Sequence, residues 1–292
     1  MNNSMKFFVS KDENLKRIDV FLTQNIPNIS RSYIKKLIVD GFVKINKVII
    51  YSPSTKIKVN DQIIINFQKK IKNKIIPSKI SLNILFEDED IIVINKPTGM
   101  VVHPGAGNLK NTLVNALKYK YNNNLSSVNG SLRPGIVHRI DKNTSGLLVV
   151  AKNNFSHFKL SEQFENHSLK RMYQCLVWGV VRPLSGKIET FITRNIYKRQ
   201  IMSVSDYKGK KAITNYKTLK TFVLNEIPKV SLVQCNLETG RTHQIRVHLE
   251  HKGSSIVGDD KYGKRKLKFK KINEKFLSYV SELSGQLLHA KT

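Results

Sequence analysis

Cysteine and tryptophan are the scarcest residues in the chain, which has two cysteines, Cys175 and Cys235, and one tryptophan. The two cysteines lie in separate apolar segments, far apart along the sequence, and we expect both to be small core residues. So low a count argues against a disulfide framework and against a cysteine metal site. It is typical of a protein from a reducing compartment.

Long hydrophobic runs are also missing. The longest apolar stretches have the length of a strand, so the sequence contains no transmembrane segment. Residues 5–9 faintly resemble the start of a signal peptide, but Lys11, Asp12 and Glu13 interrupt the stretch before an apolar region of useful length. We therefore expect a cytoplasmic protein that has no membrane partner.

Acidic side chains are few: 21 Asp and Glu stand against 50 Lys and Arg, which gives a net charge of +29 and an isoelectric point of about 10.1. This balance points to a polyanionic partner. A second cause stays open, because the chain is rich in Lys, Ile and Asn, whose codons are rich in A and T. We assign most of the extra lysines to that mutational bias and still expect a basic face.

Fingerprints of cofactor and metal sites are absent as well, since the sequence has no P-loop and no dinucleotide-binding glycine motif. Three histidines fall close together, His243, His248 and His251. No thiolate or carboxylate completes a ligand set with them, and their spacing matches no zinc motif. We expect neither a metal nor a small-molecule cofactor.

The length of 292 residues leaves room for one large domain and one small domain. We assign residues 1–70 to a small N-terminal module and residues 81–292 to the main domain. Residues 71–80 between them are charged, contain a proline and show no periodicity, so they are interpreted as a linker.

Two helices and a small basic sheet are predicted for the N-terminal module. From Leu15 onward, apolar side chains fall on one face of a helix over residues 14–25. A second helix over residues 31–39 begins after Ser30 and ends at Gly41. Short strands are expected over residues 42–46, 48–51, 56–59 and 62–67.

The main domain is predicted to combine strands with a few helices. An acidic turn joins two apolar runs at residues 84–95, which is typical of a hairpin. Helices are expected over residues 111–121 and 154–167, and the second should turn its phenylalanines toward the core: Phe155, Phe158 and Phe164. A strand is expected over residues 170–179, and strands and loops alternate over residues 187–222, with a basic section suited to contact with RNA.

Residues 135–151 are the central feature of the sequence. An apolar run leads into a polar loop, and the apolar residues 147–151 then form a buried strand. The loop holds one carboxylate, Asp141, just after the basic groups of His138 and Arg139. Such a carboxylate is held in its charged form within reach of a ligand, so Asp141 is a candidate nucleophile. The alternative is that Asp141 caps a turn, an ordinary role for aspartate.

Residues 138–152 resemble the central motif of the RluA/RluD type of pseudouridine synthases, which modify large-subunit ribosomal RNA. That motif is His-Arg-Leu-Asp, two further residues, Thr-Ser-Gly, an apolar run and Ala-Lys, and this chain departs from it only at Ile140. The resemblance implies that Asp141 is the catalytic residue. It also implies that Arg139 fills the gap left by the flipped-out base.

Two further blocks, one before this motif and one after it, follow the order of this family. Residues 84–105 resemble its opening block, in the Val-Val-His-Pro-Gly form of the RluD-like branch, where Lys96 is either part of the cleft floor or an ordinary loop lysine. Residues 170–179 resemble its second block, which implies a site role for Tyr173. A tyrosine offers a flat face to a base and a hydroxyl to a proton-transfer step, whereas the alternative is a half-buried strand aromatic.

Residues 237–249 resemble the family segment Thr-Gly-Arg-Thr-His-Gln-Ile-Arg-Val-His. The resemblance places the last arginine of this segment, Arg246, beside the catalytic aspartate. A pair of Arg246 with Asp141 would orient the carboxylate and favour its charged form.

The N-terminal residues resemble the alpha-L RNA-binding module that is named after ribosomal protein S-four. The matching pattern is Ser-Arg-Ser at residues 30–32, Ile-x-x-Leu-Ile at residues 34–38 and Gly-x-Val at residues 41–43. This resemblance implies RNA phosphate contacts from one helix, by side chains that position RNA without reading its sequence: Arg31, Lys35 and Lys36. The alternative is a solvated basic helix face.

The resemblance covers residues 14 to about 290 and implies an α+β fold. A small module of two helices and a sheet would precede a mixed, mostly antiparallel catalytic domain with a central cleft. The implied activity of this monomer is the conversion of uridine to pseudouridine in large-subunit ribosomal RNA, at a stem-loop of the subunit interface. Two rivals stay open, a related synthase acting on transfer RNA and a non-catalytic ribosome-assembly factor. The chain stops at Thr292, where family members continue with a further apolar strand and a His-Pro pair.

Overall fold

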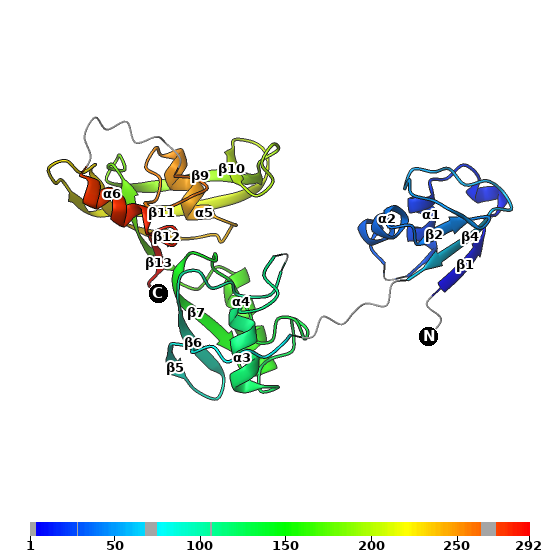
Figure 1. The fold of residues 1–292 in the computed structure, drawn as a ribbon, viewed down its shortest axis with the longest axis horizontal. Coiled ribbons are helices and arrows are strands. Elements are labelled where there is room, and N and C mark those ends of the chain that lie inside the picture. The colour runs from blue at the N-terminus through cyan, green and yellow to red at the C-terminus, as the bar shows by residue number, and fades with distance from the viewer. Residues whose placement is uncertain (1–3, 28, 68–74, 106, 264–272) are drawn as a thin grey trace. The chain divides into compact units, whose positions relative to one another are not determined.

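The computed structural model of the protein describes residues 4–27, 29–67, 75–105, 107–263 and 273–292. The chain forms two compact units, Met1–Asn73 and Lys74–Thr292 (Figure 1). Residues 71–74 of the expected linker lie outside the described residues. Residues 75–80 have no regular secondary structure and are held by the second unit, in which the Asn115 side chain donates to a backbone carbonyl of this segment at 2.7 Å.

The described part of the N-terminal unit is a four-stranded antiparallel sheet with two α-helices. Its elements are β1 (Ser4–Phe8), a short 3-10 helix (Lys11–Glu13), α1 (Ile18–Asn25), α2 (Arg31–Val39), β2 (Val43–Ile45), β3 (Val48–Ile49) and β4 (Gln62–Asn66). The strand order is β1-β4-β2-β3. Both helices and the strands contribute to one buried apolar core, which includes Phe21, Leu37 and Ile63.

The helix α2 has the bounds that the sequence predicts. The Ser30 hydroxyl accepts a hydrogen bond from the Tyr33 amide at 3.3 Å and so satisfies one of the free amide groups of the first turn. Gly41 ends the helix with a φ of 79°, and its amide donates to the Ile38 carbonyl at 3.0 Å. The prediction of a helix over residues 31–39 is confirmed.

Other predictions for this unit are wrong. The first helix begins at Ile18 rather than at residue 14, because Leu15 adopts a φ of 61° and its amide donates to the Ile57 carbonyl. This backbone turns the Leu15 side chain outward, where it is 56% exposed. Residues 56–59 form no strand: Lys56 makes an isolated bridge with Arg17, and Val59 lies in a turn. The N-terminal strand β1, which pairs with β4, was not predicted.

The second unit is organised around one long sheet of nine strands in the described residues, with the order β10-β9-β11-β12-β8-β13-β7-β6-β5. All pairs are antiparallel except β13 with β7. The elements are β5 (Ile84–Glu87), β6 (Ile91–Lys96), α3 (Leu113–Tyr121), β7 (Ser145–Ala151), α4 (Asn154–Glu165), β8 (Met172–Trp178), β9 (Ser185–Arg194), β10 (Met202–Ser205), β11 (Lys210–Phe222), β12 (Val230–Leu237), α5 (Gln244–His251), α6 (Glu274–Ser281) and β13 (Leu288–Ala290).

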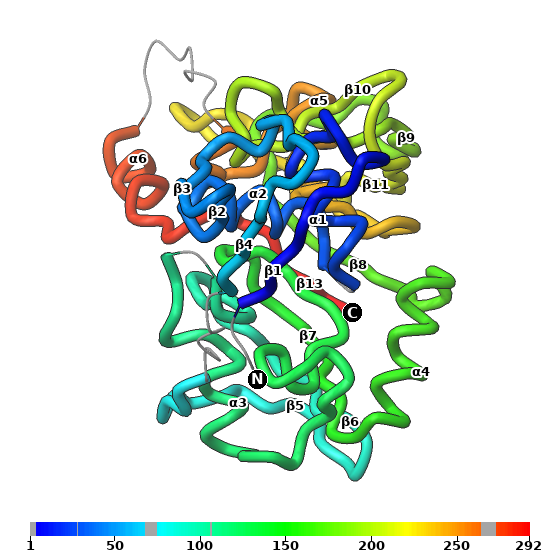
Figure 2. The backbone as a smooth tube through the Cα atoms, turned by 90° about the vertical axis from the view of Figure 1, so that its right-hand side faces the viewer, coloured from blue at the N-terminus to red at the C-terminus, as the bar shows by residue number. Residues whose placement is uncertain are grey.

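The short strand β13 joins the two halves of this sheet, since it pairs with β7 on one side and β8 on the other (Figure 2). Gly146 makes the close approach possible. It has a φ of 110°, and a side chain there would collide with the backbone of Ala290. The glycine of the central motif therefore lets the C-terminal strand lie directly beside the loop that carries Asp141.

Two large apolar cores fill the two halves of the unit, and a smaller apolar cluster forms around Ile192 and Val247. One core combines β6, β7 and α3, and the other combines β8, β12 and α5. The second core contains both cysteines, Cys175 and Cys235, which are buried and free, as expected. In the described residues no helix is long and apolar enough to cross a membrane.

The helix α4 forms where predicted, but its inward face is different. Phe155 and Phe158 are 68% and 62% exposed, so the prediction that they belong to the core is wrong. The buried positions are Ser156 and His157, whose side chains bond the Asp90 carbonyl and a neighbouring asparagine amide. Both side chains thus make a hydrogen bond on the buried face, although the Nδ1 atom of His157 has no partner there within the described residues.

Candidate active site

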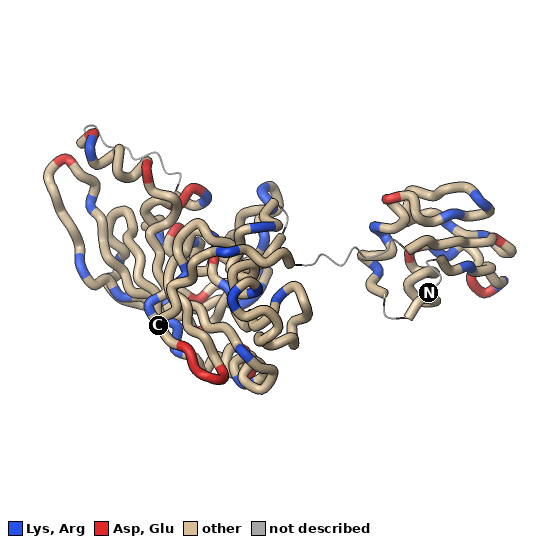
Figure 3. Tube along the Cα trace, turned by 60° about the horizontal axis from the view of Figure 1, so that its bottom comes forward, with Lys and Arg blue, Asp and Glu red and all other residues tan. Residues whose placement is uncertain are grey.

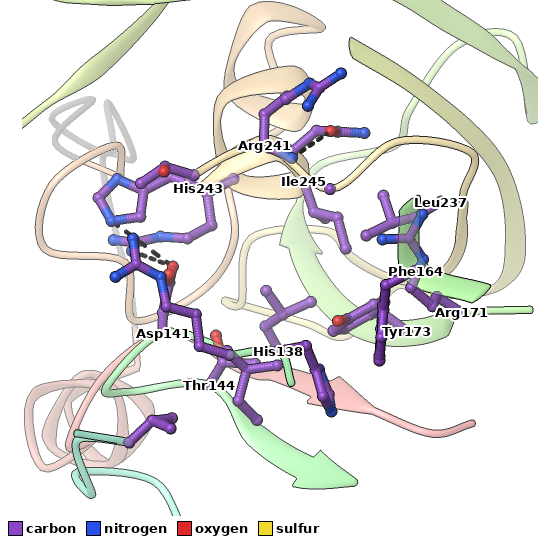
Figure 4. Close-up of a pocket in the computed structure, with 18 of the residues that line it drawn as sticks. His138, Asp141, Thr144, Phe164, Arg171, Tyr173, Leu237, Arg241, His243 and Ile245 are labelled. Atoms are coloured by element: carbon purple, nitrogen blue, oxygen red, sulfur yellow. Dashed lines mark hydrogen bonds and ion pairs between the residues drawn. The ribbon is translucent and has the colours of Figure 1, made fainter. Parts of the chain in front are cut away.

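The loop of the central motif lies against a cavity of about 750 Å³ in the second unit. Most of its lining comes from the loop 137–144, the end of α4, the start of β8 and the segment 240–246, which includes the first turn of α5 (Figure 4). Residues 101–103, Leu237 and Leu288 complete it. The sheet thus brings together three segments that the sequence marks separately. Asp141, Tyr173 and Arg246, the predicted catalytic residues, all line this one cavity.

Asp141 lies at the cavity wall with its two carboxylate oxygens in different surroundings. Its Oδ2 accepts a hydrogen bond from Arg246 Nη1 at 2.8 Å, so the predicted contact between the two residues is present. No hydrogen bond to Oδ1 forms within the part of the chain that the structure describes. One oxygen is held and the other is open to a ligand.

Arg246 is nearly fully buried and bonds two carboxylates at once. Its Nε and Nη2 donate to Asp259 at 2.7 and 2.8 Å, while Nη1 faces Asp141. Burial by itself disfavours the charged guanidinium, but the hydrogen bonds and charge of Asp259, together with those of Asp141, outweigh it and raise the pKa of Arg246. Asp259 was not identified from the sequence, although it lies in the Gly-Asp-Asp-Lys-Tyr-Gly block that follows α5.

Tyr173 forms part of the cavity wall on β8, between the two apolar cores. Burial raises the pKa of its hydroxyl, and the nearby charge of Asp141 acts in the same direction while Arg171 opposes it. The phenol is therefore protonated at neutral pH. Its ring offers a flat apolar surface, and its hydroxyl offers a hydrogen-bond donor.

The loop before Asp141 is held by its histidine. His138 Nε2 accepts a hydrogen bond from the Val149 amide at 3.0 Å, and its ring stacks on Phe164 at 4.5 Å between centroids. Burial, aided by the charge of Arg171, lowers the pKa of His138 to about 4, so the ring is neutral. Arg139, the next residue, is exposed at the cavity rim.

Lys96 holds the other side of the same loop. Its side chain is fully buried at the end of β6, and its Nζ donates to the carbonyls of Pro97, Met100 and Lys142 at 2.8 to 3.0 Å. Burial lowers the pKa of Lys96 to about 8, although the charge of Asp141 opposes the shift. Lys96 is thus a buried lysine that braces the loop of the central motif from behind, and it is not among the residues that line the cavity.

Comparisons with known proteins show the family of the chain. A model of the RNA pseudouridylate synthase family matches residues 90–251. A protein of Aquifex aeolicus, named as an uncharacterized RNA pseudouridine synthase, is 41% identical over 278 residues, which cover 95% of this chain and 85% of the relative. The chain belongs to the RNA pseudouridine synthase family. Ribosomal large subunit pseudouridine synthase D of Zymomonas mobilis is 44% identical over 86% of this chain and 78% of its own length.

A solved structure of the same family has a similar fold. Human RNA pseudouridylate synthase domain-containing protein 1 matches with a TM-score of 0.57 and 25% identity, over 73% of this chain and 78% of that chain. The prediction of an α+β protein with a mixed, mostly antiparallel catalytic domain is confirmed.

The N-terminal unit of this synthase is an S4 domain, whose model matches residues 16–63. Its helix α2 carries the three predicted RNA-binding residues on an exposed face, but they differ in their partners. The buried carboxylate of Asp19 bonds Arg31 at 2.9 Å and lies 3.8 Å from Lys35. Lys36 makes no ion pair within the described residues. Figure 3 shows that lysine and arginine are spread over both units.

Proposed function

We propose that this RNA pseudouridine synthase isomerises uridine in large-subunit ribosomal RNA, with Asp141 as the residue that acts on the ribose. The observation that carries the proposal is the different environment of the two oxygens of Asp141. One oxygen is bonded to Arg246, and the other is open to the cavity. The ribosomal substrate is supported by relatives named for the large subunit, such as the one from Zymomonas mobilis.

The reaction moves one bond within the nucleotide. The bond from N1 of uracil to C1′ of the ribose breaks, the uracil turns in the site, and C5 joins C1′ before C5 loses a proton and N1 gains one. The open oxygen of Asp141 serves either route, attack on C1′ or removal of a proton from C2′. Arg246 holds the carboxylate in place for both.

The target uridine has to leave its helix before Asp141 can reach the ribose, because the sugar of a stacked base is not accessible. Unstacking costs a few kcal/mol, and it is offset where protein groups replace the stacking of the base in its helix. We infer that Arg139, at the cavity rim, enters the gap in the RNA, and that Tyr173, in the cavity wall, stacks on the flipped base.

We further infer that the enzyme works in the cytoplasm as a monomer, on a stem-loop of the subunit interface, as the RluD-like form of its opening block indicates. None of the steps above uses a metal or cofactor. The rival functions fit some of the same observations, since a transfer-RNA synthase would use the same site and an assembly factor would need only the S4 domain.

Mapping of pseudouridines in RNA incubated with the purified enzyme tests the proposal. We expect new pseudouridines in large-subunit ribosomal RNA, and none with Asp141→Asn, because a neutral amide neither attacks the ribose nor accepts its proton. RNA affinity of the variant should stay within about threefold. If Asp141 only caps a turn, Asn would cap about as well and the activity would persist.

Each rival gives a different map. Pseudouridine in transfer RNA alone would reject the ribosomal substrate, and RNA binding without any pseudouridine would favour the assembly factor. Formation near the wild-type rate by Asp141→Asn, with the asparagine verified by mass spectrometry, would reject the role of Asp141.

A further inference from the structure

His243 is the residue of the cavity whose position the proposed chemistry does not yet explain. It lies directly before α5 in a left-handed conformation, with a φ of 57°, which non-glycine residues seldom adopt. A residue at this position commonly caps its helix, but the His243 side chain makes no such bond. Its ring instead points into the site, toward Asp141 (Figure 4).

The two ring nitrogens of His243 face two different groups. Nδ1 lies 2.8 Å from the hydroxyl oxygen of Tyr262. Nε2 lies 3.8 Å from Asp141 Oδ2, which is beyond hydrogen-bond distance. Nε2 is therefore close to the Asp141 carboxylate but makes no hydrogen bond with it.

The hydrogen bonds of Tyr262 decide which nitrogen carries the hydrogen. The Tyr262 hydroxyl oxygen accepts a bond from the Met202 amide at 2.8 Å. Within the described residues, the one acceptor in reach of the hydroxyl hydrogen is His243 Nδ1. Because Tyr262 is buried, a hydroxyl without an acceptor would be costly, so the hydroxyl donates to Nδ1. A neutral His243 then carries its hydrogen on Nε2.

Burial of the His243 ring is the main reason that it stays neutral. Burial lowers the pKa of His243, and Arg246 and Lys261 act in the same direction, while Asp141 and Asp259 oppose the shift. Tyr262 is the remaining titratable group in contact, and burial raises the pKa of its hydroxyl to about 12. At neutral pH the ring therefore has one hydrogen, and that hydrogen points into the cavity.

The same buried carboxylate that holds Arg246 also holds Tyr262. Asp259 Oδ1 accepts the Tyr262 amide at 3.1 Å, and the Arg246 guanidinium lies 5.0 Å above the Tyr262 ring. Asp259 and Tyr262 thus hold Arg246 and His243 together, and both held side chains lie toward the Asp141 side of the cavity.

We propose that His243 is a second catalytic residue, whose Nε2–H donates a hydrogen bond to the uracil while that base is detached from the ribose, and that Tyr262 is the residue that positions it. The proposal rests on the proposed function. When the bond from N1 to C1′ breaks, its electron pair stays on uracil, and the negative charge spreads over N1 and the two carbonyl oxygens. A fixed neutral donor stabilises that charge without transferring a proton.

Two substitutions at His243 distinguish a hydrogen-bond donor from a residue that only fills space in the site. His243→Leu removes the donor, and we expect the single-turnover rate to fall by about 100-fold, as when one fixed donor to a developing anion is lost. RNA affinity should stay within about twofold. His243→Gln restores an N–H near the position of Nε2, so it should recover at least about tenfold of the lost rate. Thermal unfolding of both variants controls for folding.

Tyr262→Phe tests the positioning role. We expect a rate loss of up to about tenfold, because the ring stays close but its orientation and tautomer are no longer fixed. In the His243→Leu background the same change should add almost no further loss, since residues that act as one unit are not additive. Full additivity of the two losses would overturn the coupling.

Nitrogen-15 NMR of the free protein tests the tautomer without any RNA, and so its outcome is independent of the proposed function. The wild-type spectrum should show His243 with hydrogen on Nε2 at neutral pH, and Tyr262→Phe should shift the mixture toward Nδ1. A hydrogen on Nδ1 in the wild type, a normal rate in His243→Leu, or a His243→Gln enzyme as slow as His243→Leu would each overturn the proposal. Absence of pseudouridine from the wild-type enzyme would instead reject the proposed function.

Discussion

Arg246 is the residue on which the geometry of the site depends most. It satisfies Asp259, which is buried with it, and uses its remaining nitrogen to hold Asp141. Removal of the side chain would leave Asp259 unpaired in the interior, which costs about 3 to 5 kcal/mol where burial is complete. Loss of activity in Arg246→Ala would therefore mix a catalytic effect with a loss of stability.

Arg246→Lys separates the two effects. Lysine keeps the positive charge near Asp259 but lacks the planar fork, so it cannot bond both carboxylates. We expect the single-turnover rate to fall by about 100-fold while RNA affinity changes by less than about threefold, as measured by rapid quench and filter binding. A normal rate at unchanged stability would show that Asp141 does not need this partner.

His138 is a single residue that makes the free energy of unfolding depend on pH. Its folded-state pKa is about 4, below the ordinary value of 6.5, because it is buried. Between pH 6.5 and about 4 the unfolded chain binds a proton at this ring and the folded chain does not, so the free energy of unfolding falls as the pH is lowered. The full effect is about 3 kcal/mol.

Urea unfolding at pH 7 and at pH 4.5, compared between wild type and His138→Gln, measures this effect. The variant cannot titrate at that position and should lose less stability in acid. His248, whose pKa burial also lowers to about 4, is present in both proteins and cancels. Equal acid losses in the two proteins would contradict the assignment.

At the scale of elements, the helix α2 presents three cations that are not equivalent. The Asp19 carboxylate neutralises part of the charge of Arg31 and lies near Lys35. The Lys36 side chain is therefore the most available of the three to bind a phosphate. The interaction with Asp19 also fixes Arg31 against α1, which gives it a structural role in the S4 domain.

We expect Lys35→Ala with Lys36→Ala to weaken RNA binding and to reduce the slope of log affinity against log salt by about 0.7 to 0.9 for each phosphate that is no longer neutralised by a lysine. The single-turnover rate at saturating enzyme should stay unchanged. Each single variant, Lys35→Ala and Lys36→Ala, is compared with the control Lys159→Ala on α4, which also removes one positive charge, from an exposed helix of the catalytic unit. Equal slopes for wild type and double variant would exclude α2 from the RNA interface.

At the scale of the whole molecule, the two units have separate apolar cores, and the cavity belongs to the second unit alone. A chain without residues 1–73 should therefore fold and keep its site. We expect weaker RNA binding with a smaller salt dependence, because fewer counterions are released. Isomerisation should persist at high enzyme concentration, and a fully inactive but folded truncated chain would show that the S4 domain completes the site.

The sequence by itself determined the local features of this protein. Short apolar runs bounded by turn residues predict the β5–β6 hairpin and β7, and Ser30 with Gly41 predicts both ends of α2, because caps and apolar patterns act over a few residues. The resemblance of motifs predicts that Asp141, Tyr173 and Arg246 are site residues. The same local reasoning failed at Phe155 and Phe158, since the burial of a helix face depends on what lies opposite it.

Only the tertiary structure decided how the site is assembled. Arg246 and Asp141 are 105 positions apart in the sequence and meet because the sheet brings α5 over the loop of the central motif. The contacts among Asp259, Tyr262 and His243 do not follow from the sequence blocks that contain these residues, because a hydrogen-bond network is defined by distances rather than by spacing along the chain. Local sequence selects the backbone of each segment, whereas packing of distant segments fixes which polar groups face one another and therefore which of them take part in the chemistry.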